Sequence, residues 1–314
     1  MNIQKIIIRV AILTVCSFLV SYITISLDGD KKSLEVFPFS LAEKYTKSNE
    51  FENTDVSVNK KIESTEIKKI QIESVRTDIA IEFGNTDTLS VNLVGYFPQE
   101  DKKNLLSVDV TGKEIIIKIN EEDNSGFHFF NFINFSSNSQ SGKLMVTIPL
   151  QVQNLNLSTV SGDINIKGKN YLNLIAKTVS GDLNSVDLKT KEFNFSTVSG
   201  DLNLTGAVEN LGFKSVSGDL DFKSELNKIN LVSKTTSGDT KISFNKLPDL
   251  SMHFSSVSGE TVIDKKYVTQ KPNTKLISES DDDSDDTDNI YKLGTGEGEL
   301  NVKSVSGDLI IKDF

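Results

Sequence analysis

From about residue 150 to the end of the chain, apolar and polar positions alternate on each side of a recurring Ser-Gly-Asp triplet. Apolar residues recur at offsets −7, −5, −2, +2 and +4 from the triplet glycine, and they occupy 30 of these 35 positions. Alternation with a period of two is typical of half-buried strands, so each copy predicts two short strands joined at a sharp corner. The seven glycines, spaced by 19, 19, 18, 20, 21 and 48 residues, are Gly162, Gly181, Gly200, Gly218, Gly238, Gly259 and Gly307.

One copy cannot bury its own apolar face, whereas stacked copies bury a continuous core. The sequence therefore predicts an all-β fold, a β-solenoid (parallel β-helix-like) of ~19-residue rungs, roughly 34 Å long for seven rungs. The third copy shows the apolar positions as Phe193, Phe195, Val198, Leu202 and Leu204. Asparagines that could hydrogen-bond from rung to rung occupy the polar positions Asn156, Asn165, Asn184, Asn194, Asn203 and Asn301.

The triplet is interpreted as structural turn chemistry. Glycine permits a positive φ at the corner, and Asp or Ser side chains can accept from nearby backbone N–H groups. A row of Asp could also bind cations, but the Gly-Gly-x-Gly-x-Asp pattern of calcium-binding repeats is absent, and we expect no metal and no cofactor. The turn acids are Asp163, Asp182, Asp201, Asp219, Asp239 and Asp308, with Glu260 in the sixth copy.

The N-terminal segment 1–27 reads as a transmembrane anchor. Eighteen uncharged, mostly apolar residues run from Val10 to Leu27, which as a helix would reach roughly 27 Å. Lys5 and Arg9 precede them, so the positive-inside bias places the N-terminus in the cytoplasm and the repeats outside. A cleaved signal peptide is an alternative without a good small-x-small cleavage site. A lipoprotein signal at Cys16 is another, but Val15 is bulky for a lipobox, and a buried structural Cys16 is the simpler interpretation.

The remaining segments divide as follows: a tether over 28–60, degenerate rungs and an N-terminal cap over 61–150, the solenoid over 151–264, an acidic loop over 265–295, and a final rung over 296–314. Glu279 to Asp288 carries seven acids and no base, which predicts a solvated loop. A phenylalanine cluster in the cap predicts either a cover over the core or a partner or membrane contact, and it comprises Phe127, Phe129, Phe130 and Phe132.

Composition narrows the function. The net charge of −10 argues against nucleic acid as a partner, because phosphate binding needs clustered positive charge. One Cys excludes a disulfide framework, and two His leave few groups for catalysis. The charge is +2 over residues 1–27 and −7 over the acidic loop, so the repeats themselves are nearly balanced.

The octapeptide from Thr159 to Ile166, repeated downstream and preceded by the strand-like segment from Leu144 to Pro149, resembles a bacterial domain of unknown function called "putative adhesin". The resemblance covers about residues 65–314. It implies a β-solenoid or sandwich-like domain in the cell envelope, often tethered to the membrane, with no catalytic residues to carry over.

These observations predict a non-enzymatic, membrane-anchored module of the cell envelope for binding, adhesion or structural support. The alternative is an extracytoplasmic sensor or regulator of envelope stress, acting through a membrane partner because only Met1 to Arg9 would lie inside. A carbohydrate-active β-helix enzyme would need clustered acids and bases, and nothing separates such acids from the repeated turn Asp. The expected partners are the membrane, through the N-terminal helix, and another membrane protein or a surface ligand.

Overall fold

The computed structural model describes residues 53–63, 66–98, 105–120, 142–168, 172–264, 266–267 and 287–314. This part of the chain is all-β, with twenty strands and no helix. None of its elements is a helix long and apolar enough to cross a membrane. The predicted transmembrane helix with Cys16, the Phe127–Phe132 cluster and the acidic residues 279–286 lie outside the described residues.

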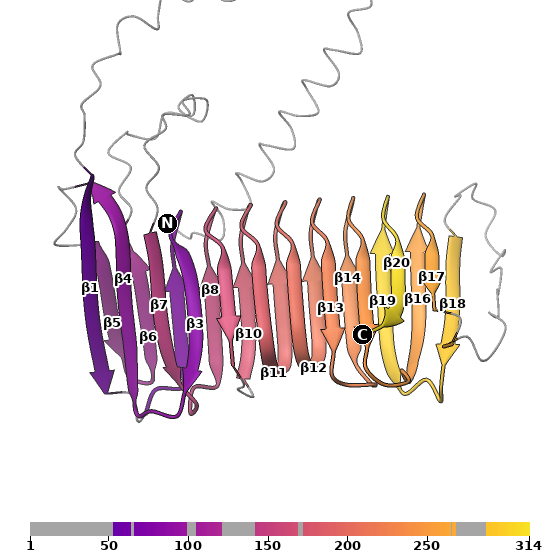
Figure 1. Cartoon of the computed structure of the whole chain (residues 1–314), viewed down its shortest axis with the longest axis horizontal. Coiled ribbons are helices and arrows are strands. Elements are labelled where there is room, and N and C mark those ends of the chain that lie inside the picture. The colour runs from indigo at the N-terminus through magenta and orange to yellow at the C-terminus, as the bar shows by residue number, and fades with distance from the viewer. Residues whose placement is uncertain are drawn as a thin grey trace, which may run out of the picture. The chain divides into compact units, whose positions relative to one another are not determined.

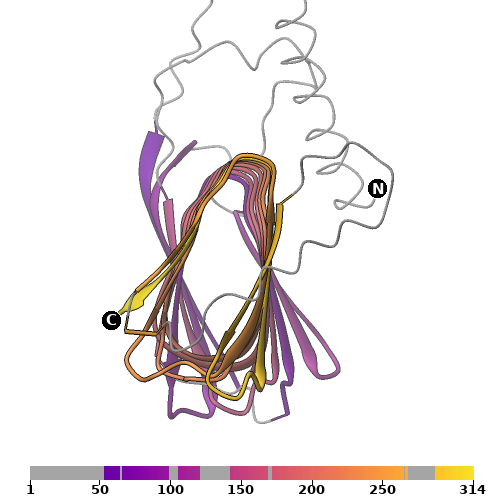
Figure 2. The same ribbon diagram turned by 90° about the vertical axis from the view of Figure 1, so that its right-hand side faces the viewer.

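The strands form rungs, each with one strand before a corner and one after it, so the twenty-stranded sheet has two faces (Figures 1 and 2). The first face contains the strands before the corners: β2 (Lys69–Glu73), β8 (Asn154–Ser158), β10 (Leu172–Lys177), the second halves of β11 (Leu183–Ser196) and β12 (Leu202–Lys214), β14 (Asn230–Lys234), β19 (Gly298–Ser304) and β16 (Leu250–Ser256). The second face contains the strands after them: β3 (Asp78–Gly84), β9 (Ile164–Lys167), the first halves of β11 and β12, β13 (Leu220–Ser224), β15 (Thr240–Phe244), β20 (Leu309–Asp313) and β17 (Thr261–Ile263). Within each face these strands are parallel, and on the first face the register shifts between Leu172 and Asn173 where β10 pairs with β11.

Both ends of the stack carry antiparallel strands. At the N-terminal end, β7 (Gly142–Pro149), β4 (Thr88–Pro98) and β1 (Asn53–Glu63) continue the second face, while β6 (Glu114–Ile119) and β5 (Leu106–Thr111) continue the first. The Lys60 ammonium donates to the Leu106 carbonyl at 2.9 Å and so links the two faces there. At the other end, β18 (Thr287–Leu293) pairs antiparallel with β16.

Two boundaries differ from the sequence prediction. Strand β1 begins at Asn53, inside the expected tether, and β18 occupies part of the expected acidic loop. Neither strand belongs to a Ser-Gly-Asp copy, so the repeat pattern gave no signal for them. Both run antiparallel at an end of the stack, where they pair with an edge that would otherwise expose unpaired backbone groups.

The core lies between the two faces and is lined by the inward positions of every rung. Phe193, Phe195, Leu202 and Leu204 of the third copy are at most 2% exposed, as predicted. The Phe195 ring stacks on that of Phe213 in the next rung, with centroids 6.1 Å apart. Val198, at the −2 offset, is only half-buried because it lies at the tip of the corner rather than on a strand. The strand offsets were therefore predicted correctly and the −2 offset was not.

The asparagine positions lie on the outer faces, and some of them bond between rungs. The Asn203 amide donates to the Asn184 side-chain oxygen at 3.1 Å, and Asn230 donates likewise to Asn210 at 2.9 Å. Asn194 and Asn301 instead donate to glutamates of their own strands, Glu192 and Glu299. Rung-to-rung bonds between asparagine side chains therefore form in some neighbouring pairs, and the Asn210 amide also donates to the Lys191 backbone carbonyl of the preceding rung at 2.9 Å.

The rungs do not stack in chain order. Strand β19 pairs with β14 on one side and β16 on the other, and β20 lies between β15 and β17 in the same way. The Gly307 copy is thus inserted between the Gly238 and Gly259 copies, as the yellow strands between orange ones show in Figure 1. Strands β19 and β20 form this rung, which is the second from the end of the stack and not the final one. The sixth copy is the terminal rung.

Candidate functional site

The corners line one edge of the stack, where they superimpose as nested arches when the stack is viewed end-on (Figure 2). A Ser or Thr stands three residues before every corner glycine, and in most corners its hydroxyl closes the turn. In the third copy the Thr197 hydroxyl accepts from the Gly200 N–H at 2.9 Å, and equivalent bonds of 2.7–3.1 Å close the corners at Gly162, Gly181, Gly218 and Gly259. The first rung has the same bond between Ser74 and the Thr77 N–H, without a glycine. Six of the eight described corners therefore share this bond, whereas at Gly238 the Thr235 hydroxyl donates to the glycine carbonyl at 3.0 Å.

The corner glycines are required by close approach between rungs, and not by a positive φ. Among the described residues, the glycines with positive φ are Gly95, Gly112, Gly168, Gly206, Gly294 and Gly296, none of which is a corner glycine. A Cβ added to Gly200 would lie 2.0 Å from the Gly181 carbonyl oxygen, and the other corner glycines meet the preceding corner at 1.9–2.3 Å. The positive φ expected at the corner glycines is therefore wrong, and the close approach between rungs is the reason for glycine there.

The corner acids form a ladder along the stack. Each Asp carboxylate accepts a hydrogen bond from the backbone N–H of the corresponding acid in the next rung. These bonds measure 2.8–3.0 Å and join, in order, Asp78, Asp163, Asp182, Asp201, Asp219, Asp239, Asp308 and Glu260. We call the seven Asp the aspartate row. The carboxylates satisfy backbone donors of a neighbouring rung, which fixes the spacing from corner to corner.

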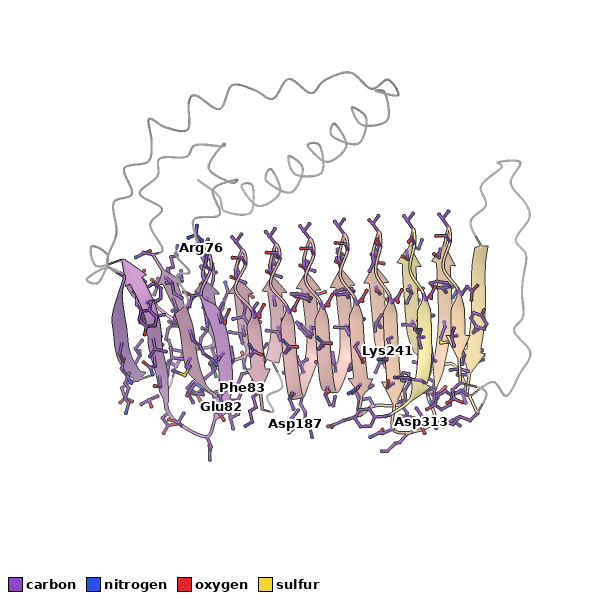
Figure 3. All side chains as sticks on the ribbon, turned by 45° about the horizontal axis from the view of Figure 1, so that its top comes forward. Arg76, Glu82, Phe83, Asp187, Lys241 and Asp313 are labelled. Carbon is purple, nitrogen blue, oxygen red and sulfur yellow. The ribbon has the colours of Figure 1, made fainter. Side chains whose placement is uncertain are left out.

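The tips of the corners expose a line of β-branched residues, here called the tip row. It comprises, in stack order, Val75, Val160, Val179, Val198, Val216, Thr236, Val305 and Val257. Val216 is 40% exposed, Val305 50% and Val257 56%. Backbone bonds hold each tip to the next, as where the Val198 and Ser199 N–H groups both donate to the Val179 carbonyl. The tip row is therefore rigid, and its members are exposed except for Val160, Val179 and Val198, which are half-buried. Arg76 of the first corner is labelled in Figure 3.

Lysines flank the tip row on the first face. Lys214, Lys234 and Lys303 occupy equivalent positions on the adjacent strands β12, β14 and β19 and are exposed. Lys177 has the same position on β10, two strands away across Ser196. Within the described part of the chain, none of these four lysines forms an ion pair. This lysine row, the tip row and the aspartate row run parallel along one edge.

A second cluster holds the inserted rung. The Asp249 carboxylate, between β15 and β16, accepts from the Thr295 hydroxyl at 2.8 Å and from the Gly296 and Glu297 N–H groups in the turn before β19. The Thr295 hydroxyl bond, followed by these backbone bonds, holds the pKa of Asp249 below its ordinary value. Lys228, before β14, forms an ion pair with Glu297 at 2.9 Å. The turn before the inserted rung is therefore attached to both neighbouring rungs.

The other end of the inserted rung is held near a cavity of about 260 Å³ at the edge opposite the corners, where Asp313 is labelled in Figure 3. The Asp313 carboxylate pairs with Lys266 and accepts from the Tyr267 hydroxyl at 3.1 Å. The bond with Lys266 lowers the pKa of Asp313, and burial raises that of Tyr267. Leu247, Asn245 and Lys246 complete the lining. Lys266 and Tyr267 follow β17, so these contacts attach the end of β20 to the terminal rung.

No group of three or more His, Cys, Asp or Glu in the described ranges is placed to hold a metal ion. The predicted corner residues lie together along the edge, while Phe127, Phe129, Phe130 and Phe132 lie outside the described residues. Sequence reasoning missed the lysine row and the exposure of the tip row. The signal for the lysines was present, because Lys177, Lys214, Lys234 and Lys303 all stand four residues before a corner glycine.

No curated protein matches the chain, and the comparison with solved structures finds bacterial proteins of low identity. A putative cell adhesion protein from Clostridium sporogenes ATCC 15579 is 14% identical, with a TM-score of 0.32 over 83% of this chain and 100% of that one. A putative adhesin from Bacteroides fragilis NCTC 9343 is 15% identical, with a TM-score of 0.40 over 82% and 97%. A putative lipid binding protein from Parabacteroides distasonis ATCC 8503 is 14% identical, with a TM-score of 0.36 over 82% and 96%.

The sequence profile of Toastrack DUF4097 matches residues 67–312, which include every corner and the Asp249 cluster. The match confirms the resemblance drawn from the repeated Ser-Gly-Asp copies. This chain belongs to the Toastrack DUF4097 family.

Proposed function

We propose that this protein is a non-enzymatic module of the cell envelope that binds or supports other surface components through its corner edge. The observation that carries the proposal is the repetition of one backbone-bonded tip, exposed in five rungs and half-buried in three, along eight consecutive rungs. A rigid surface loses little conformational entropy when it binds, so a row of fixed side chains favours contact with an extended partner. The residues that define the edge have structural bonds and show no constellation suited to catalysis.

The N-terminal segment supports a location for this module. We infer that residues 10–27 anchor the chain in the membrane, with the N-terminus in the cytoplasm and the rungs outside. The support is the uncharged length of this segment and the lysine and arginine before it. Protease added to intact cells should then degrade the rungs and leave a short membrane-bound fragment. Release of the whole chain into the medium would instead indicate a cleaved signal peptide.

The function is tested by covalent crosslinking of the intact membrane protein, followed by identification of the partners. The edge variant carries Val160→Thr, Val179→Thr and Val198→Thr. Thr236 already occupies this row, so threonine fits the corner geometry. The matched control carries Val186→Thr, Val232→Thr and Val262→Thr, which are 40–55% exposed on the outer faces. Loss of crosslinked partners in the edge variant alone supports the proposal, and unchanged partners in the edge variant contradict it.

The phenylalanine cluster is a second contact that we propose for the same module, and it rests on the sequence alone. Five Phe lie between residues 126 and 136 beside a polar segment, a density typical of apolar contact sites. Replacing Phe129 and Phe130 with Ser should abolish partner or membrane contact while leaving the unfolding temperature unchanged. A lowered unfolding temperature would instead assign these rings to the core.

Deletion of the protein separates adhesion from sensing. An adhesion or support module predicts weaker surface attachment with unchanged stress-gene expression. The alternative, a regulator acting through a membrane partner, predicts the reverse.

A further inference from the structure

The corner edge carries two like-charged rows that the described chain does not neutralise. Lys214, Lys234 and Lys303 are direct cross-strand neighbours, at about 4.8 Å per strand, and like charges directly opposite each other are destabilising. On the other side of the tip row, the aspartate row repeats an acid in seven consecutive rungs. Across the edge the order is therefore positive, apolar, negative. A suitable partner presents the opposite order.

A second copy of this chain presents that order when it is rotated by 180° about an axis parallel to the stack. The tip rows then face each other, and the lysine row of each copy faces the aspartate row of the other. Because this rotation preserves direction along the stack, equal rungs meet: Lys177 faces Asp182, Lys214 faces Asp219, Lys234 faces Asp239 and Lys303 faces Asp308. Rotation about a perpendicular axis would place lysines on lysines and aspartates on aspartates, which is unfavourable.

We propose that the corner edge binds a second copy of this chain, with the two stacks parallel and in register. This deepens the proposed function, since it names the partner of the same edge. The parallel arrangement also places Asn53 of both copies at the same end, so the preceding segments of both can reach one membrane. An anionic lipid surface fits the edge less well, because it would repel the aspartate row.

The size of the contact sets its strength. Eight corners span seven intervals of ~4.8 Å, and a strip as wide as the ~10 Å between packed sheets gives roughly 340 Å² per copy. Stable complexes bury roughly 800 Å² per partner, so this contact belongs to the weak, transient class. Copies held on one membrane meet at a high effective concentration, which favours such a contact.

The test is disulfide crosslinking of the full-length chain in membranes, in a Cys16→Ser background. Val216→Cys, at the middle of the tip row, should form a homodimer, since the two-fold axis brings equal positions together. Val232→Cys is the matched control, because it is also 40% exposed but lies on the outer face of β14. The proposal is overturned if Val216→Cys forms no more dimer than Val232→Cys. So does capture of a different protein at Val216→Cys in place of a second copy.

Direction is tested with two differently tagged chains, one with Val75→Cys in the first rung and one with Val257→Cys in the terminal rung. Parallel stacks predict that each variant crosslinks only to its own kind. A mixed Val75→Cys with Val257→Cys dimer would show antiparallel stacks and overturn the proposed arrangement. This test is independent of the partner crosslinking that tests the proposed function. A chain that binds another protein without self-association would give crosslinked partners in that experiment but no homodimer in this one.

Charge is tested with Lys214→Glu and Lys234→Glu together. Each copy loses two cross-edge ion pairs and gains two repulsions, so crosslinking of Val216→Cys should fall by about tenfold. The control with the same charge change, Lys191→Glu and Lys223→Glu, alters exposed lysines away from the corner edge and should leave crosslinking unchanged. Equal loss in both variants would mean that net charge rather than the lysine row is responsible, and would overturn the charge pairing.

Discussion

The interior corners and the two end corners follow different sequence rules, and the difference shows which way the stack is built. Interior corners have both glycine and aspartate. The first corner has Thr77 where the others have glycine, and the terminal corner has Glu260 where the others have aspartate. A corner glycine makes room for the carbonyl of the preceding rung, and a corner aspartate accepts from the following rung. Within the described residues, the first corner has no preceding corner and the last has no following one, so each end lacks the residue that such a neighbour would require.

The largest expected effect is at an interior glycine. Gly200→Ala should destabilise the fold by about 3 kcal/mol, because its Cβ would lie 2.0 Å from a backbone oxygen in two rigidly bonded corners. Gly112→Ala is the control, since Gly112 has a φ of +59° but open space around it, and should cost about 1 kcal/mol. Urea unfolding measures both. Equal costs would show that conformation, and not close approach, selects glycine in the corners.

The second-largest loss of stability is expected where a hydrogen bond of the aspartate row is removed. Asp201→Ala removes the acceptor of the Asp219 N–H and should cost about 1.5 kcal/mol by the same measurement. Glu260→Ala should change the free energy of unfolding by less than about 0.5 kcal/mol, because among the described residues no next corner donates to Glu260. A cost at Glu260 as large as that at Asp201 would remove the distinction between interior and end corners.

The turn opposite the corners gives a smaller effect. Asp187 has a φ of 58° at a register shift between β11 and β12, a conformation that glycine adopts freely. Asp187→Gly should change the free energy of unfolding by less than about 0.5 kcal/mol. Asp187→Val should lower it by about 1 kcal/mol, because β-branched residues are poorly suited to positive φ. Thermal unfolding of the two variants compares them. Equal tolerance of Val would contradict the strained backbone.

The smallest global effect should come from Asp249, at the exposed turn of the inserted rung. Its pKa is lowered in the folded state, so its stabilisation is complete above the ordinary value of 3.8 and is lost as the pH falls through the lower folded pKa. Asp249→Ala should increase hydrogen exchange in β19 at neutral pH, and the difference from the parent should vanish in strong acid. A difference that persists unchanged at pH 2 would show that the carboxylate charge is not involved.

The sequence predicted the corners, the strand offsets and the all-β stack, because each is set by a local repeat of about 19 residues. It did not predict the rung order, since every rung offers the same apolar inward face and the same backbone edges to its neighbours. Only Glu260, which stands where the other copies have Asp, distinguishes the terminal rung in the sequence. Its significance becomes apparent only once the hydrogen bonds of the aspartate row are known. The sequence did not predict that Val216 and other residues of the tip row are exposed. The alternating pattern treats the −2 offset as a strand position, whereas it lies at the tip of the corner.

The place of the inserted rung sets a condition on how the chain folds as it is made. Residues 250–263 leave the ribosome before residues 298–313, yet the later segment lies between the earlier one and β15. A nascent chain that has reached residue 263 therefore lacks the rung between β14–β15 and β16–β17. Strands β16 and β17 must then either leave a gap one rung wide or stay unpaired until β19 and β20 have been synthesised. Growth of this fold is thus not a simple addition at one end. Its last step is an insertion, which makes an incompletely synthesised chain structurally distinct from a complete one.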